Sequence, residues 1–200
     1  MLRKFLCVVV ILALVGCGQN TPSGPPPLTS SESGNGKERQ VGAAKVASLP
    51  GPVCMPWNQM TQAEREWQVV QVAILDQGKI GGQCKVWVQD VVWRASGRQV
   101  WLPANAGSGS TYGITWESSP KVVGQSGGIS GARVGQIVQM RIRTNLGVTP
   151  HTAIITRIGS SDMEWIDSNW VGPNKVGTHT MKLKDFNKNV ISYSLMTIIG

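Results

Sequence analysis

The sequence predicts an α+β domain in which two helices come first and a run of antiparallel strands follows. Apolar side chains recur at helical spacing at about 62–77 and again at about 83–95. After Gly135 the pattern changes to β-branched or alternating segments that are bounded by Gly, Pro, Asn or Ser-Asp turns. This order is typical of an antiparallel sheet with N-terminal helices packed on one side of it.

The first helix has a start signal and an apolar face. Thr61 and Glu64 have the spacing of a capping box, in which each side chain accepts a hydrogen bond from the other residue's backbone N–H. Apolar residues then recur on one face: Trp67, Val70 and Ile74. We expect the helix to stop at Gly78.

The second helix follows a Gly81-Gly82 turn and carries a cysteine at its start. Cys84, Val88 and Val91 fall at i, i+4 and i+7, so the thiol lies on the apolar face. A helix N-terminus favours the thiolate, and the glycines allow a sharp turn that leaves the sulfur uncovered. We interpret Cys84 as a nucleophile, and the alternative is a buried structural thiol.

Residues 104–134 are rich in glycine and serine, with Tyr112 and Trp116 among them. We expect a long loop here, either the lid or wall of a groove or a surface insertion. The strands predicted after it are Ile137–Arg143, His151–Ile158, Met163–Trp170, Val176–Leu183 and Val190–Ile199.

Two of these strands carry polar groups that suit a cysteine mechanism. His151 begins one strand, while Asp167 and Asn169 share a parity near the end of the next. A hairpin between the two strands places the imidazole beside 167–169, where either residue can orient it during acyl transfer. We take His179 as structural or exposed and expect no metal site, because the histidines and cysteines lack paired spacing.

The N-terminus predicts export and lipidation. Arg3 and Lys4 precede the apolar run 5–15, which is too short to span a bilayer and marks residues 1–16 as a signal peptide. The run ends in Leu-Val-Gly-Cys17, which resembles a bacterial lipobox. The resemblance implies that Cys17 is acylated and anchors the protein to an envelope membrane on its exported side, the outer membrane in a diderm. The alternative is an ordinary signal peptide.

Residues 17–50 read as the lipidated cysteine and a disordered tether, and 51–200 as one domain. The net charge of +8 is compatible with an anionic envelope polymer, but no basic run indicates nucleic acid. We expect a monomer. The exported domain keeps Cys54 and Cys84, so a disulfide between them is an alternative to a nucleophilic thiol.

Four segments occur in a distinctive order: Gly81–Val88, Val134–Gln139, His151–Ile155 and Trp165–Trp170. Together they resemble the CHAP domains, the cysteine, histidine-dependent amidohydrolases and peptidases. The resemblance spans residues 80–199 and implies a papain-like fold for the domain 51–200. It also implies that the partner is peptidoglycan or a cell-wall peptide, since many members cut peptidoglycan as N-acetylmuramoyl-L-alanine amidases or cross-bridge endopeptidases.

The resemblance implies a role for each polar residue of the site. Cys84 is the nucleophile, His151 the base, Asp167 the match for the family's orienting acid and Asn169 the match for its following polar partner. The family commonly has the longer Glu where this chain has Asp167, so which of Asp167 and Asn169 orients His151 stays open. Only Asp76 lies close before Cys84, so we expect no calcium and no cofactor.

Eight tryptophans are many for this length, and Trp116 and Trp170 are candidates to stack on sugar rings of a substrate. Two other functions stay open beside peptidoglycan hydrolysis. One is a non-catalytic lipoprotein that binds an envelope glycan or peptide, and the other is a thiol amidase acting on a different peptide.

Overall fold

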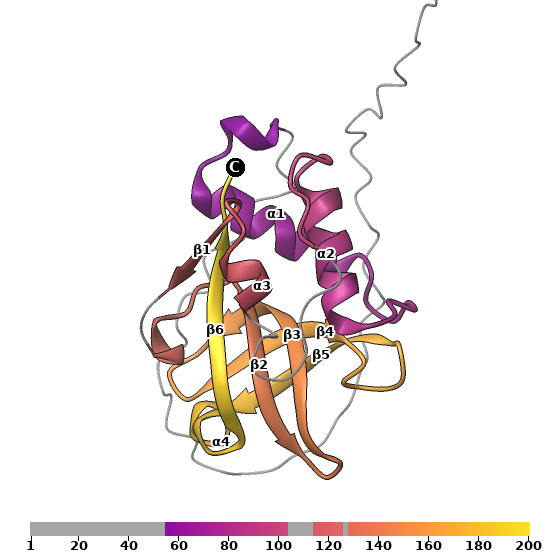
Figure 1. Ribbon diagram of the computed structural model, residues 1–200, viewed down its shortest axis with the longest axis vertical. Coiled ribbons are helices and arrows are strands. Elements are labelled where there is room, and N and C mark those ends of the chain that lie inside the picture. The colour runs from indigo at the N-terminus through magenta and orange to yellow at the C-terminus, as the bar shows by residue number, and fades with distance from the viewer. Residues whose placement is uncertain (1–54, 104–113, 126–127) are drawn as a thin grey trace, which may run out of the picture. The chain divides into compact units, whose positions relative to one another are not determined.

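The computed structural model describes residues 55–103, 114–125 and 128–200, and these form helices and one antiparallel sheet (Figure 1). The helices are α1 (Gln62–Ile74), α2 (Cys84–Ala95), α3 (Ile114–Glu117) and α4 (Leu183–Asn189), with 3-10 turns η1 (Trp57–Gln59) and η3 (Ile129–Gly131). The strands are β1 (Val122–Gln125), β2 (Ile137–Thr144), β3 (Gly147–Ile158), β4 (Asp162–Ser168), β5 (Val176–Lys182) and β6 (Val190–Ile198). Their order in the sheet is β1-β6-β2-β3-β4-β5. The predicted α+β class is confirmed.

Helix α1 begins at the predicted capping box. The Thr61 Oγ1 atom accepts a hydrogen bond from Glu64 N at 3.3 Å, and Glu64 Oε2 accepts one from Thr61 N at 2.7 Å. These contacts satisfy two of the N–H groups that a helix start leaves without partners.

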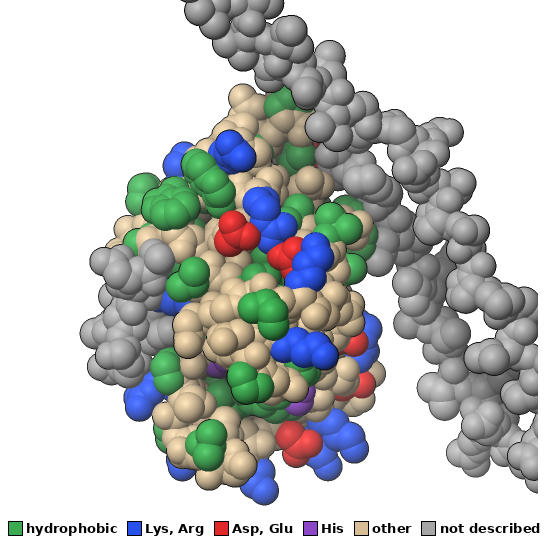
Figure 2. Space-filling model, turned by 90° about the vertical axis from the view of Figure 1, so that its right-hand side faces the viewer, with side chains coloured by type: hydrophobic (Ala, Val, Ile, Leu, Met, Phe, Trp, Pro, Cys, Tyr) green, Lys and Arg blue, Asp and Glu red, His purple; other side chains and the backbone are tan. Residues whose placement is uncertain are grey.

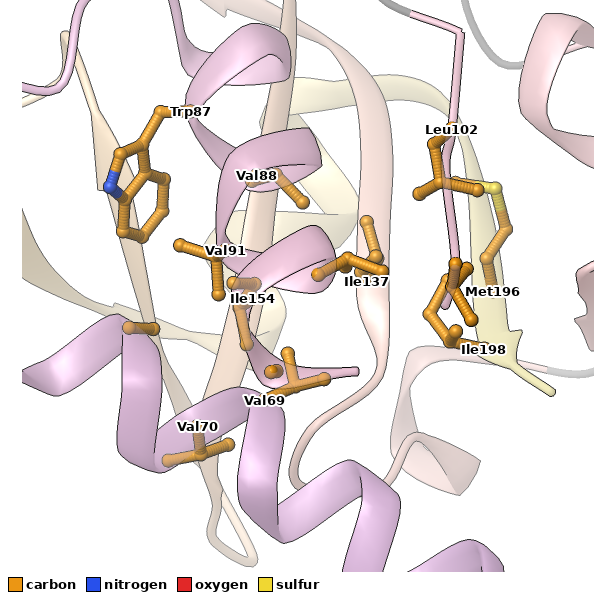
Figure 3. Close-up of a cluster of buried hydrophobic side chains, with 14 of the residues drawn as sticks. Val69, Val70, Trp87, Val88, Val91, Leu102, Ile137, Ile154, Met196 and Ile198 are labelled. Atoms are coloured by element: carbon orange, nitrogen blue, oxygen red, sulfur yellow. The ribbon is translucent and has the colours of Figure 1, made fainter. Parts of the chain in front are cut away.

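Helices α1 and α2 cover one face of the sheet. Val69 and Val70 of α1 and Val88 and Val91 of α2 are buried in one cluster with strand residues that include Ile154 (Figure 3). Neighbouring strand residues alternate between this cluster and a second one on the opposite face, as the period of two along a strand requires. The sheet is therefore buried on both faces.

The second cluster lies under α4, which the sequence did not predict. Phe186 of α4 is fully buried there with Trp165 of β4 and Tyr193 of β6 beside it. Its ring meets Trp165 at 6.4 Å and Tyr193 at 5.2 Å between centroids, both edge to face. The aromatic contacts explain why this short helix forms between two strands.

The expected long loop 104–134 is only partly a loop. Within it the structure places α3, β1 and η3, and β1 adds a strand to the sheet by pairing Val122 with Ile198 of β6. Residues 104–113 and 126–127 lie outside the described residues, so whether they act as a lid stays a prediction.

The signal peptide 1–16, Cys17, the tether 17–50 and Cys54 also lie outside the described residues. Among the residues that are described, no helix has the length and apolar character needed to cross a membrane.

Gly135, at the turn before β2, carries a stability prediction. Its φ is +89°, and an added Cβ atom would lie 2.3 Å from the carbonyl oxygen of Glu66 in α1. Gly135→Ala should therefore lower the free energy of unfolding by about 3 kcal/mol, from backbone strain and from pushing α1 away from the sheet. Urea unfolding measures this.

Gly78→Ala is the matched control, because Gly78 has a φ of +82° with no atom within 4 Å of the added Cβ. It should cost only the strain, about 1 kcal/mol. Equal losses in the two variants would show that the contact with Glu66 is unimportant.

Candidate active site

The turn before α2 fixes where Cys84 lies. Gly82 has a φ of +75°, and a Cβ atom on Gly81 would meet side chains of Val176, Trp87 and Ser168 within 3 Å. Ser168 Oγ, at the end of β4, donates a hydrogen bond to Gly82 O at 2.6 Å. The N-terminus of α2 is thereby attached to the end of β4.

Cys84 is the first residue of α2, and it is less open than the sequence suggested. Only 8% of the residue is exposed, whereas the glycine turn predicted an uncovered sulfur. Among the described residues, no disulfide involves Cys84. Cys54 lies outside the described residues, so its pairing with Cys84 stays an alternative that a thiol assay tests.

The β3–β4 hairpin brings His151 to Asp167. The strands pair Ile154 with Ile166, and His151 Nε2 lies 3.1 Å from Asp167 Oδ2. The predicted hairpin is therefore present. The buried Nε2–H group is not aligned with the oxygen as a good hydrogen bond, which is common in active sites before a substrate binds.

Asp167 is fully buried and holds two further contacts. Its Oδ2 accepts a hydrogen bond from Trp165 Nε1 at 2.7 Å, and its Oδ1 accepts one from the backbone N–H of Trp170 at 3.2 Å. A buried carboxylate is tolerated when its oxygens are satisfied in this way. The side chain that faces His151 is thus Asp167.

Asn169 does not share the orientation that its parity predicted. Strand β4 ends at Ser168, and Asn169 has a φ of +81°, a left-handed conformation that Asn adopts more readily than most residues. Its Nδ2 donates to Gln83 Oε1 at 3.2 Å, and its Oδ1 accepts from Asn174 N. Asn169 therefore supports the residue before Cys84.

The charge of His151 follows from its neighbours. Burial alone would lower its pKa, but interactions with Asp167 and Cys84 outweigh burial and raise the pKa to about 9. At neutral pH the imidazole is therefore protonated, between a carboxylate on one side and a sulfur on the other. This arrangement favours a thiolate–imidazolium pair, the form in which a cysteine attacks.

The raised pKa of His151 predicts alkaline loss of stability. The unfolded value is about 6.5, so the stabilisation is fully present below pH 6.5 and is lost as pH rises through about 9. We expect the free energy of unfolding to fall by about 3 kcal/mol across that window. Urea unfolding at a series of pH values measures it.

The control is His151→Asn, which should be less stable than the wild type at pH 6. Its free energy of unfolding should not fall between pH 6.5 and about 9 as that of the wild type does. A wild-type curve that matches the variant's slope from pH 6 to pH 9 would contradict a protonated, stabilising His151.

A cleft of about 640 Å³ opens at this point. Cys84 of α2 and the preceding residue Gln83 line it, and His151 lines it from β3. The rest of the lining comes from the β2–β3 turn, the end of β4, and β5 and α4: Ile142, Arg143, Thr144, Asn145, Leu146, Thr149, Pro150, Asn169, Trp170, His179, Met181 and Asn189. Figure 2 shows histidine atoms reaching the surface among hydrophobic side chains on one face of the molecule.

Comparisons with known proteins add only a distant likeness. No family model matches the chain. No curated protein matches it either. Among solved structures, Ly7917 has a TM-score of 0.48 at 18% identity, covering 70% of this chain and 63% of its own. Ly7917 with the hydrolyzing product of MDP gives 0.47 at 14% identity, with coverages of 68% and 63%.

PlyC gives a TM-score of 0.46 at 19% identity, with coverage of 68% of this chain and 36% of its own. This chain therefore spans less than two thirds of each of these three structures.

The two candidate sugar-stacking tryptophans differ. Trp170 is half-buried, lines the cleft and lies 5.1 Å from the His151 ring between centroids. Trp116 is fully buried, and its Nε1 donates to Pro103 O at 2.8 Å. Trp116 therefore belongs to the core and presents no ring face to a ligand, which corrects the prediction.

His179 is a cleft residue that the sequence analysis missed. It lies 4.9 Å from the Trp170 ring and 4.8 Å from the Trp165 ring, between centroids. Burial lowers its pKa, as does the charge of His151, while Asp167 opposes both. No sequence signal distinguished it, because its position depends on β5 lying beside β4.

The described part of the chain offers no cluster of side chains that could bind a metal ion. No group of three or more His, Cys, Asp or Glu side chains gathers there.

Proposed function

We propose that the protein is a membrane-tethered cysteine hydrolase of the CHAP type that cleaves amide bonds of peptidoglycan. The observation that carries the proposal is the meeting of Cys84 and His151 at one cleft, with the buried Asp167 in contact with His151. The three residues come from a helix start and two adjacent strands, in the order that the resemblance to CHAP domains implies.

The mechanism follows from this geometry. The Cys84 thiolate attacks the amide carbonyl carbon, and the carbonyl electrons move to its oxygen. His151 then gives its proton to the leaving nitrogen as the C–N bond breaks, which yields a thioester and a free amine. His151 next takes a proton from water, whose oxygen attacks the thioester carbonyl, and the C–S bond then breaks to release a carboxylic acid and restore the Cys84 thiolate beside a protonated His151.

The transient oxyanion needs donors close to the sulfur. The first turn of α2 supplies backbone N–H groups and the positive end of the helix dipole. Gln83 also lines the cleft, and its Oε1 accepts a hydrogen bond from Asn169. That contact leaves Gln83 Nε2 available as a second donor.

Digestion of purified sacculi tests the proposal. Full-length protein in detergent should release muropeptides, and mass spectrometry of the products identifies the cleaved bond. An amidase frees the stem peptide from the muramic acid, whereas an endopeptidase opens the cross-bridge. Protein alkylated at Cys84 should release nothing. Tight sacculus binding without any release would instead support the non-catalytic lipoprotein.

The location is part of the proposal. Acylation of Cys17 would place the domain on the exported side of an envelope membrane, where peptidoglycan is within reach of a tether about 33 residues long. Mass spectrometry of the mature N-terminus should find diacylglycerol on Cys17. An unmodified Cys17 in mature protein would remove the lipid anchor from the proposal and leave the hydrolase intact.

A further inference from the structure

Lys85 is a lysine in an unusual place. It follows Cys84 in the first turn of α2, and only 4% of it is exposed. By contrast, the side chain of Lys79 in the preceding turn is 64% exposed and pairs with Asp76. Removing an ammonium group from water is costly, so buried lysines are rare unless something compensates.

The Lys85 ammonium is held against an aromatic ring. Its Nζ atom lies 5.0 Å from the centre of the Trp116 ring. The ring itself is fixed, since Trp116 is fully buried and donates its Nε1–H to Pro103 O. A desolvated cation over a tryptophan face is among the stronger cation–π contacts. Core packing therefore fixes a buried positive charge on the residue that follows the nucleophile in the first turn of α2.

The Lys85 ammonium and the Cys84 sulfur interact electrostatically. Burial lowers the pKa of Lys85 to about 8, and Cys84 is the group that opposes this by raising it. Such coupling is reciprocal, so a Cys84 anion that favours the ammonium is itself favoured by the ammonium. His151 also interacts with Cys84, so the thiolate has cationic partners on two elements, α2 and β3.

We propose that Lys85 is a positioning residue for the nucleophile: its buried ammonium, held over Trp116, stabilises the thiolate of Cys84 together with His151. The inference rests on the proposed function in treating Cys84 as the nucleophile. The ionisation of Cys84 can be measured without any substrate, so the role of Lys85 and the hydrolase function are tested independently.

The test is the pH dependence of Cys84 alkylation in the full-length chain. Cys84 is the only cysteine in its tryptic peptide, which is Ile80–Lys85 in the wild type, Ile80–Arg94 in Lys85→Met and Glu66–Lys85 in Lys79→Met. Pulse labelling with light and then heavy iodoacetamide therefore reports on Cys84 in each protein. Lys85→Met keeps the length of the side chain and removes its charge. We expect the midpoint of alkylation to rise by about one pH unit, with about tenfold slower labelling at neutral pH.

Two variants separate charge from packing. Lys85→Arg keeps the cation and should keep the midpoint within about 0.3 pH units. Lys79→Met removes the same charge from the exposed neighbouring turn and should leave the midpoint unchanged, because water screens that site. The proposal is overturned if Lys85→Met leaves the midpoint unchanged, or if Lys79→Met shifts it equally.

A measurement on the native lysine covers the case in which Lys85→Met unfolds the protein. NMR of ¹³Cε,¹⁵Nζ-lysine in the wild type and in Cys84→Ser should show Lys85 titrating at lower pH once the sulfur anion is gone. Identical Lys85 titrations in the two proteins would also overturn the proposal.

Discussion

Cys84→Ala should reduce muropeptide release by about a million-fold, to the detection limit of the sacculus assay. Removing a catalytic nucleophile costs this much in hydrolases that act through a covalent intermediate. Cys84 is small and lines the cleft, so the variant should lose little stability. The release rate measured by mass spectrometry, with urea unfolding of the same sample, checks both statements.

His151→Ala should also remove most of the activity, because it takes away both the proton acceptor and the cation that favours the thiolate. The double variant should be no worse than Cys84→Ala alone, since residues that act as one unit are not additive. Release at the wild-type rate by either single variant would contradict the hydrolase and favour a binding protein.

The site residues were predictable where local periodicity decides the geometry. Cys84 begins α2 and His151 lies within β3, so the 3.6-residue and two-residue periods indicated which face each side chain occupies. Asn169 lies one residue past β4, where the period no longer applies. Its contact with Gln83 depends on a positive φ that the sequence did not signal.

The fold was predictable in a similar way. The capping box of α1 and the β3–β4 hairpin depend on residues a few positions apart. Strand β1 depends on pairing with residues of β6 that lie 70 to 76 positions later, and its glycine-containing segment has little strand character of its own. The burial of Trp116 likewise depends on partners from other segments, Lys85 and Pro103.

The carboxylate of Asp167 has a double role, because it faces His151 through Oδ2 and also accepts hydrogen bonds from Trp165 Nε1 at Oδ2 and from the Trp170 N–H at Oδ1. Asp167→Ala leaves Trp165 Nε1, the Trp170 N–H and a buried imidazolium without their acceptor. We expect the free energy of unfolding to fall by about 3–5 kcal/mol. Urea unfolding at pH 6 measures this loss.

Asp162→Asn is the matched control on the same strand. Asp162 is paired with Arg157 at 2.7 Å, but both side chains are partly exposed. A surface pair of this kind contributes at most about 1 kcal/mol. If the two aspartate variants lost equal stability, the buried contacts of Asp167 would contribute no more to the free energy of unfolding than a surface ion pair does.

Asp167→Asn separates the catalytic role from the structural one, because it keeps the size of the side chain and one oxygen acceptor. That oxygen can still receive the Trp165 N–H, yet the negative charge that stabilises the His151 imidazolium is gone. We expect kcat to fall by about 10³–10⁴, with the His151 pKa moving below its present value of about 9. The thiolate loses support with it, so Cys84 alkylation should slow at neutral pH in parallel with hydrolysis. If hydrolysis is lost while alkylation keeps the wild-type pH profile, Asp167 acts on the leaving-group step and not on the charge of His151.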